Sequence, residues 1–317
     1  MVLEEQHPGQ LTAIIKKQKP YLKDTSIAQY KRAIHKLHHL INGEKSEIKN
    51  FNFIENSEKV NEVLQQFHYT TRRNYYSAII TLLQAEDTPN KELIREYSDI
   101  VKEANTKYEE EQESGKVSEK QKDSLLIKED YHKIEEFINK VKEDNNEMLY
   151  ILLRLITTYQ IRNEIATLKL IKLMPFKKLK KEDKEGKNYL VMGSKKILIV
   201  RYDFKTNKKY KEITIEVNDK KLSKEIRSYV KTLKNDNVFE YKGEQLEPKK
   251  LTNLLIYYSK KLVGVPLSTT MLGKSILSEK YAPQLKLQKE DAKNRGHSVN
   301  VQNKVYVKTK QPNTPSQ

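Results

Sequence analysis

Towards the C-terminal end of the chain, a histidine and a tyrosine are spaced in a way that could support chemistry. His297 lies in Asn294-Arg295-Gly296-His297-Ser298, where a helix is expected to open, and Tyr306 follows it by nine residues. A tyrosine hydroxyl can act as a nucleophile and form a covalent intermediate. Short motifs recur by chance. On this pattern alone, an ordinary helix-start histidine and one of nineteen tyrosines remain an equal alternative.

An arginine and a glutamate form a second candidate group. The strongly apolar segment 148–159 is predicted to be the central core helix of its domain, and it runs directly into Gln160-Ile161-Arg162-Asn163-Glu164. Side chains two residues apart do not face each other on a helix. The spacing therefore favours a turn that carries Arg162 and Glu164 over a salt bridge on a helix surface.

A basic hairpin supplies the third group. After Pro175 the apolar pattern changes to a period of two, which predicts strands at 188–192, 196–202 and 211–217. The segment between the last two strands carries Lys205. A basic hairpin that is merely solvated is the alternative interpretation of this segment.

Taken in order, these groups resemble the catalytic domain of the tyrosine recombinases, the phage-type integrases. The resemblance implies that Tyr306 attacks a scissile DNA phosphate and forms a 3′-phosphotyrosyl link without metal or cofactor. It implies that Arg162 and His297 stabilise the charge of the transition state, and that Lys205 protonates the departing 5′ oxygen. Glu164 would support the site.

Details of the motifs resemble the integrases of eukaryotic DNA viruses and virophages most closely. That branch often has Arg-Asn-Glu, as at 162–164, and a Tyr-Lys-Thr segment that is Phe204-Lys205-Thr206 here. Lys208 and Lys209 are the alternatives to Lys205 as the hairpin lysine. The family also leads us to expect a helix directly after the arginine turn, over Leu168 and Leu170.

One motif departs from the family pattern. Where the second catalytic arginine should lie, in Thr270-Met271-Leu272-Gly273-Lys274, this chain has Gly273, while Lys274 fits the lysine of the viral branch. A fixed charged donor at a transition state contributes about 3 kcal/mol. Lys274 or Arg295 would be substitute cations, although lysine lacks the guanidinium fork. A weakened or inactive enzyme, and a deliberate change that traps a complex, are the other interpretations.

Composition narrows the class of protein. The chain has 317 residues, which predicts two domains, and a net charge of +17, which favours a polyanionic partner. It contains no cysteine, so disulfides, thiolate zinc sites and cysteine nucleophiles are excluded. No metal site is expected at its histidines. The absence of an apolar run long enough to span a bilayer and of a signal-like N-terminus predicts an intracellular protein that is not secreted and has no membrane partner.

We expect an α+β fold, mainly α with a small antiparallel sheet. A helical core-binding domain at 1–106, a linker at 107–126, the catalytic domain at 127–308 and a polar tail at 309–317 are predicted. The first domain would clamp DNA by its basic helix faces, although a solvated charged face is an equal alternative. The DNA-binding candidates are Lys31, Arg32, Arg72, Arg73, Lys208 and Lys209.

The resemblance implies double-stranded DNA as partner and a homotetramer on DNA, with a monomer when free. The site of action would be wherever the DNA lies, the host nucleus or a viral factory. Two alternative functions stay open: a non-catalytic DNA-binding protein on a recombinase scaffold, which the loss of the arginine at Gly273 allows, and an enzyme like type IB topoisomerases.

Overall fold

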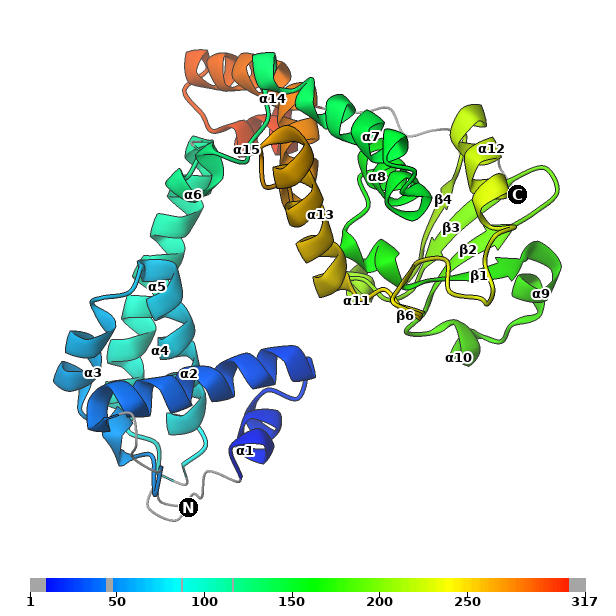
Figure 1. Cartoon of the computed structure of the whole chain (residues 1–317). Helices are drawn as coiled ribbons and strands as arrows, with labels where there is room; N and C mark the ends of the chain where they lie inside the picture. The colour runs from blue at the N-terminus through cyan, green and yellow to red at the C-terminus, as the bar shows by residue number, and fades with distance from the viewer. Residues whose placement is uncertain (1–9, 44–47, 87, 116, 308–317) are drawn as a thin grey trace, which may run out of the picture. The chain divides into compact units, whose positions relative to one another are not determined.

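The computed structural model describes residues 10–43, 48–86, 88–115 and 117–307 (Figure 1). The chain divides into two compact units, Met1–Lys116 and Val117–Gln317. Both are mainly helical, and the second also contains a four-stranded sheet. The predicted fold class, mainly α with a small sheet, is confirmed. The predicted polar tail, 309–317, lies outside the described residues.

The first unit packs its helices around one apolar core. Its elements are α1 (Leu11–Gln18), α2 (Asp24–Asn42), the 3₁₀ turn η3 (Asn52–Ile54), α3 (Ser57–Leu64), α4 (Tyr69–Leu83) and α5 (Lys91–Ser114). Asn56 and Asn90 cap α3 and α5, since each side chain accepts a hydrogen bond from a backbone N–H of the first turn. The core includes Ile34, Leu37 and Ile79, all fully buried.

Helix α5 extends further than the sequence predicts. A linker at 107–126 is expected, but α5 continues to Ser114 and α6 (Glu119–Lys122) follows. The extension is rich in glutamate, a good helix former, and α4 holds it in place. The Tyr69 hydroxyl donates to the Glu111 carboxylate, and Arg73 Nη1 donates to Asn105 Oδ1 at 3.0 Å. The division after Lys116 falls within the predicted linker range.

The second unit alternates helices with short strands (Figure 1). Before the sheet lie η4 (Lys128–Asp130), α7 (Lys133–Glu143), α8 (Glu147–Tyr159) and the 3₁₀ helix η5 (Asn163–Thr167). The sheet region holds β1 (Leu168–Lys172), α9 (Leu173–Lys178), α10 (Lys181–Lys184), β2 (Asn188–Met192), β3 (Ile197–Arg201), α11 (Asn207–Tyr210) and β4 (Ile213–Glu216). The last elements are α12 (Lys220–Tyr229), β5 (Glu240–Tyr241), β6 (Glu244–Gln245), α13 (Pro248–Val263), α14 (Thr269–Asn294), α15 (Val299–Val301) and the π-helical turn η6 (Gln302–Tyr306).

The sheet is mixed, not purely antiparallel as predicted. Its strand order is β1-β2-β3-β4, in which β1 pairs parallel to β2 and the other pairs are antiparallel. The predicted strands at 188–192, 196–202 and 211–217 correspond to β2, β3 and β4. The expected helix over Leu168 and Leu170 is wrong, because these residues lie in β1. The connection through α9 and α10 is long enough to return the chain for parallel pairing.

The two faces of the sheet pack against different helices. Leu190 and Ile199 point into the main core, which also holds the buried residues of α8, including Leu152 and Ile156. On the other face, Val191 packs in a smaller cluster with side chains of α9. Helix α8 is therefore the central core helix that its apolar sequence predicts, and the arginine turn follows from its C-terminal end.

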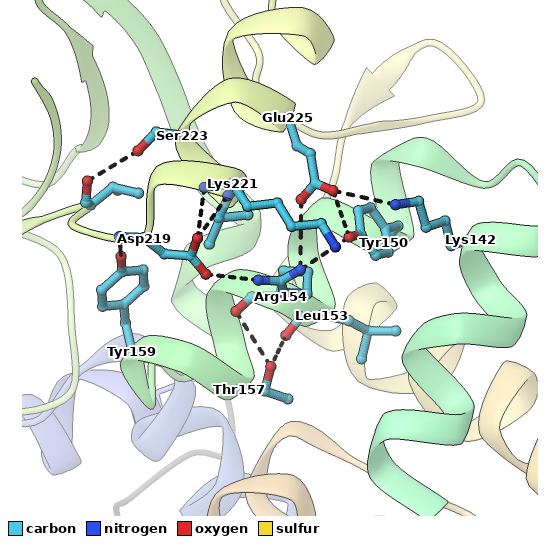
Figure 2. A network of polar contacts seen from close by, with 12 residues as sticks. Lys142, Tyr150, Leu153, Arg154, Thr157, Tyr159, Asp219, Lys221, Ser223 and Glu225 are labelled. Atoms are coloured by element: carbon cyan, nitrogen blue, oxygen red, sulfur yellow. Dashed lines mark hydrogen bonds and ion pairs between the residues drawn. The ribbon is translucent and has the colours of Figure 1, made fainter. Parts of the chain in front are cut away.

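A polar network ties α8 to α12 (Figure 2). Arg154 Nη2 donates to Asp219 Oδ2 at 2.8 Å, and Arg154 Nη1 donates to the Tyr150 hydroxyl at 3.1 Å. That hydroxyl donates to Glu225 Oε1 at 2.9 Å, and Lys142 Nζ lies 3.3 Å from the same oxygen. Asp219 also caps α12. The network thus holds α8 in place, and the turn that carries Arg162 follows the C-terminal end of this helix.

Candidate active site

Arg162 lies on the turn that its spacing from Glu164 predicts. Helix α8 ends at Gln160, whose backbone is left-handed with φ 54°, and Arg162 is the N-cap of η5 in an extended conformation. The Arg162 side chain is exposed and that of Glu164 is half-buried. Directly after η5 the chain enters β1 at Leu168, so the turn lies at one end of the sheet.

The hairpin loop that carries Lys205 lies against this turn. It joins β3 to β4, which are antiparallel neighbours. The backbone N–H of Lys205 donates to Glu164 Oε1 at 3.3 Å, while the Lys205 side chain is exposed. The carboxylate of Glu164 thus joins the arginine turn to the lysine loop.

A buried asparagine holds the turn and the loop together. Asn188 is 1% exposed. Its Nδ2 donates to Asp203 O at 2.9 Å, to Thr167 Oγ1 at 3.1 Å and to Glu164 O at 3.4 Å. Its Oδ1 accepts from the backbone N–H groups of Asp203 at 3.0 Å and Tyr202 at 3.1 Å. All its hydrogen-bonding groups are therefore used to fix the loop geometry.

Arg201 is a cation at this site that the sequence analysis missed. It is the last residue of β3, and its guanidinium carbon lies 5.4 Å from the centre of the buried Phe204 ring. Burial lowers the pKa of the Arg201 guanidinium; Glu164 acts to raise this pKa and Arg162 to lower it. Both Glu164 and Arg162 therefore act electrostatically on Arg201. We call Arg162, Glu164, Arg201 and the backbone of Lys205 the cation cluster.

Gly273 lies beside the beginning of the arginine turn. It is in the second turn of α14, which Ser268 caps by accepting a hydrogen bond from Met271 N at 3.2 Å. A methyl group built on Gly273 would meet Gln160 Oε1 at 3.9 Å and no other atom within 4 Å. That amide oxygen is buried and has no hydrogen-bond donor among the described residues. The position therefore has room for a Cβ atom, and an unpaired acceptor lies beside it.

The tyrosine and histidine stack on each other. Ser298 caps α15 by accepting from Val301 N at 3.3 Å, so a helix opens here as predicted, although α15 is short and continues as η6. The rings of His297 and Tyr306 are 4.8 Å apart at 16°, and the Arg295 guanidinium carbon lies 5.6 Å from the Tyr306 ring. Tyr306 is 55% exposed. We call 295–307 the nucleophile segment.

The structure brings some predicted site residues together and leaves others apart. Arg162, Glu164 and the Lys205 loop form the cation cluster, and Gly273 adjoins it through Gln160. Among the described residues, no hydrogen bond, ion pair or ring contact joins the nucleophile segment to the cation cluster. Lys274 is half-buried. The two other hairpin lysines, Lys208 and Lys209, lie in α11 beside the Lys205 loop.

The DNA-binding candidates of the first unit lie on two helices. Lys31 and Arg32 are on α2, and Arg32 Nε donates to Ala28 O at 3.2 Å. Arg72 and Arg73 are on α4, where they line a groove with Lys107 of α5. The groove gathers these positive charges together with the carboxylate of Glu103.

Neither a metal-binding cluster nor a membrane-spanning helix occurs in the part of the chain that the structure describes. There, no three His, Asp or Glu side chains gather in a way that could hold a metal ion. No described helix combines the length and the apolar character needed to cross a bilayer.

Comparison with known proteins adds one finding. No model of a protein family matches the sequence, and no curated protein matches it. A search of solved structures finds the crystal structure of XerA recombinase, with a TM-score of 0.35 and 12% sequence identity over 87% of this chain and 85% of that chain. At this TM-score the likeness carries no argument about fold or function, so the functional proposal rests on the residues described above.

Proposed function

We propose that the protein is a tyrosine recombinase, an enzyme that cleaves and rejoins DNA strands through a 3′-phosphotyrosyl intermediate. The observation that carries the proposal is the cation cluster. Its arginine turn and its lysine loop are far apart in the sequence, yet the Glu164 carboxylate and the buried Asn188 hold them together. The stacked His297 and Tyr306 supply the other groups of the proposed mechanism, the attacking hydroxyl and a second group that stabilises charge.

In the proposed mechanism the Tyr306 hydroxyl loses its proton to solvent water as its oxygen attacks the scissile phosphorus, and the bond between phosphorus and the 5′ oxygen breaks. The Lys205 ammonium gives its proton to the departing 5′ oxygen. Arg162 and His297 stabilise the charge on the non-bridging oxygens, and because such donors are already in position they need no reorganisation. Rejoining reverses these steps with a 5′ hydroxyl as the attacking group.

The two halves must meet at one phosphate. A reacting atom has to lie about 3 Å from both the nucleophile and the charge-stabilising donors. Because no hydrogen bond, ion pair or ring contact among the described residues joins the two halves, we propose that the bound DNA phosphate itself bridges them. The Tyr306 side chain is exposed, and its hydroxyl has no hydrogen bond within the described part of the chain that would oppose such an encounter.

The finer features of the proposal come from the sequence motifs. We place the protein nearest to the integrases of eukaryotic DNA viruses and virophages, acting on double-stranded DNA as a homotetramer in the host nucleus or a viral factory. The first unit would act as the core-binding domain, with Lys31, Arg32, Arg72 and Arg73 contacting phosphates. The high positive charge of the chain supports DNA as the partner.

A non-catalytic DNA-binding protein is the second candidate, and Gly273 favours it. Glycine offers no side-chain donor where the family has its second arginine. The scaffold and the charge would be retained for binding while strand cleavage is lost.

The test is a search for the covalent intermediate. The protein is incubated with nicked suicide duplexes of random sequence and of candidate element ends, and adducts are resolved on a denaturing gel. An adduct that disappears with Tyr306→Phe is the expected result. Gly273→Arg is run in parallel. If neither chain forms an adduct on DNA that it binds, the non-catalytic function is correct instead.

A further inference from the structure

Arg201 is a charged side chain at the site that the proposed mechanism does not use. In the register of the sheet it lies opposite Asn188 on β2 and Ile213 on β4. Asn188 is the residue that fixes the arginine turn to the lysine loop. Arg201 is therefore held by strand pairing on both sides, at the sheet position where the cation cluster is assembled.

The guanidinium of Arg201 has no polar partner among the described residues. Its Nε is buried and makes no hydrogen bond to any described residue. The same is true of Glu164 Oε2. No ion pair joins the two side chains. A buried donor without an acceptor is costly and calls for a functional explanation.

The charge balance of the cation cluster favours an anion as the missing partner. An arginine keeps its charge in proteins. The charge of Arg162 acts to lower the pKa of Arg201, and the single carboxylate of Glu164 acts to raise it. The exposed Lys205 ammonium adds a further positive charge at the rim. The cluster thus carries an excess of positive charge that an incoming phosphate would neutralise.

We propose that Arg201 supplies the second guanidinium for the scissile phosphate, in place of the arginine that is absent at Gly273. This inference rests on the proposed recombinase function. The space at Gly273 is open towards Gln160, whereas Arg201 reaches the cluster from β3. The second cation would then come from the sheet and not from α14.

A structural role for Arg201 makes a different prediction. The side chain packs on the Phe204 ring, and it could serve simply to hold the loop. Loss of a structural arginine would slow the reaction with any substrate to the same extent. Loss of an arginine that neutralises a phosphate oxygen would matter only while that oxygen is charged.

The experiment compares two suicide duplexes, one with the normal phosphodiester and one with a methylphosphonate at the scissile position. The methylphosphonate replaces one charged non-bridging oxygen by a neutral methyl group. For each protein we would measure the ratio of the two initial rates of adduct formation. Because both rates come from one preparation, the ratio is independent of the fraction of folded protein.

We expect Arg201→Gln to slow adduct formation on the phosphodiester by about 10²–10³-fold and to react like the wild type on the methylphosphonate. Arg201→Lys should recover part of the phosphodiester rate, because it keeps the charge but not the fork. Arg227→Gln is the matched control, since Arg227 donates to Gly193 O at 2.8 Å in the turn at the other end of β3. Its ratio should equal that of the wild type.

Several results would overturn the inference while leaving the recombinase function intact. These are an unchanged rate ratio in Arg201→Gln, whether or not both rates fall, and an adduct that forms only with Gly273→Arg. If no chain, including Gly273→Arg, forms a Tyr306-dependent adduct on either duplex, the recombinase function itself fails and the inference fails with it.

Discussion

The cation cluster and the nucleophile segment are held in the structure by very different means. Asn188 is almost fully buried and fixes the cluster through hydrogen bonds to the backbone of Glu164 and of the neighbouring residues Tyr202 and Asp203. The nucleophile segment relies on the stacking of His297 on Tyr306, and the Tyr306 ring is largely exposed. The chain thus preorganises the groups that would bind the phosphate and leaves the attacking group to be positioned with DNA. A substitution that disrupts the cluster should therefore lower the free energy of unfolding. A substitution of the attacking group should abolish the chemistry and leave the free energy of unfolding nearly unchanged.

The largest effect on stability is expected from Asn188→Leu. Leucine has a similar size, but it removes all five hydrogen bonds of the amide, including those to backbone groups of Tyr202 and Asp203. We expect the free energy of unfolding to fall by about 3 kcal/mol. Urea unfolding followed by circular dichroism measures this change.

Asn139→Leu is the matched control for that substitution. Asn139 lies exposed on α7, so the same change there should alter the free energy of unfolding by less than about 0.5 kcal/mol. Equal stability of the two variants would show that Asn188 does not hold the cluster, and the contrast between the two regions would then be wrong.

The sequence predicts the elements with strong periodic patterns well. The apolar run of α8 and the alternation in β2, β3 and β4 are clear, and each forms as expected. The strand β1 was missed because Leu168-Lys169-Leu170 is short and follows an arginine motif that suggested a helix. Its pairing with β2 depends on a distant segment, which no local pattern records.

The candidate site was predictable only in part, for the same reason. The motifs gave Arg162, Glu164 and Lys205, and the structure brings these together. Arg201 went unnoticed because it ends a strand without any motif around it. Its importance comes from Asn188 opposite it in the sheet, and this register is a tertiary property. No sequence pattern indicates whether the segment around Tyr306 contacts the cluster.

A smaller effect on stability should come from the charge of Asp219. The hydrogen bond from the backbone N–H of Leu222 lowers the pKa of this carboxyl, whereas burial raises it. The Arg154 guanidinium also lowers it, and the pKa lies below its ordinary value. A lowered pKa adds stability that is present above the pKa of the unfolded chain, about 3.9, and is lost as the pH falls through the folded value. The network of Figure 2 anchors α8, and the arginine turn of the cation cluster follows α8 directly. The stability contributed by Asp219 therefore supports the part of the fold that carries the cluster.

The measurement compares wild type and Asp219→Asn in urea unfolding over a series of pH values. Asparagine is also a good helix N-cap, so the difference isolates the charge. At pH 7 we expect the variant to be less stable by about 1 kcal/mol, since the pair with Arg154 is partly exposed. The difference should shrink once the pH drops below about 4. A difference that stays constant with pH would mean that the Asp219 charge contributes nothing.

The smallest effect on stability is expected at the residue with the largest proposed role in chemistry. Among the described residues the Tyr306 hydroxyl makes no hydrogen bond, and phenylalanine would keep the ring stacked on His297. Tyr306→Phe should therefore change the free energy of unfolding by less than about 0.5 kcal/mol while abolishing the covalent adduct. Urea unfolding and the suicide-duplex gel on one preparation measure both quantities. A loss of stability comparable to that of Asn188→Leu would mean that the hydroxyl is part of the packed structure, and Tyr306 would then belong to the rigid half of the site and not to the half that DNA positions.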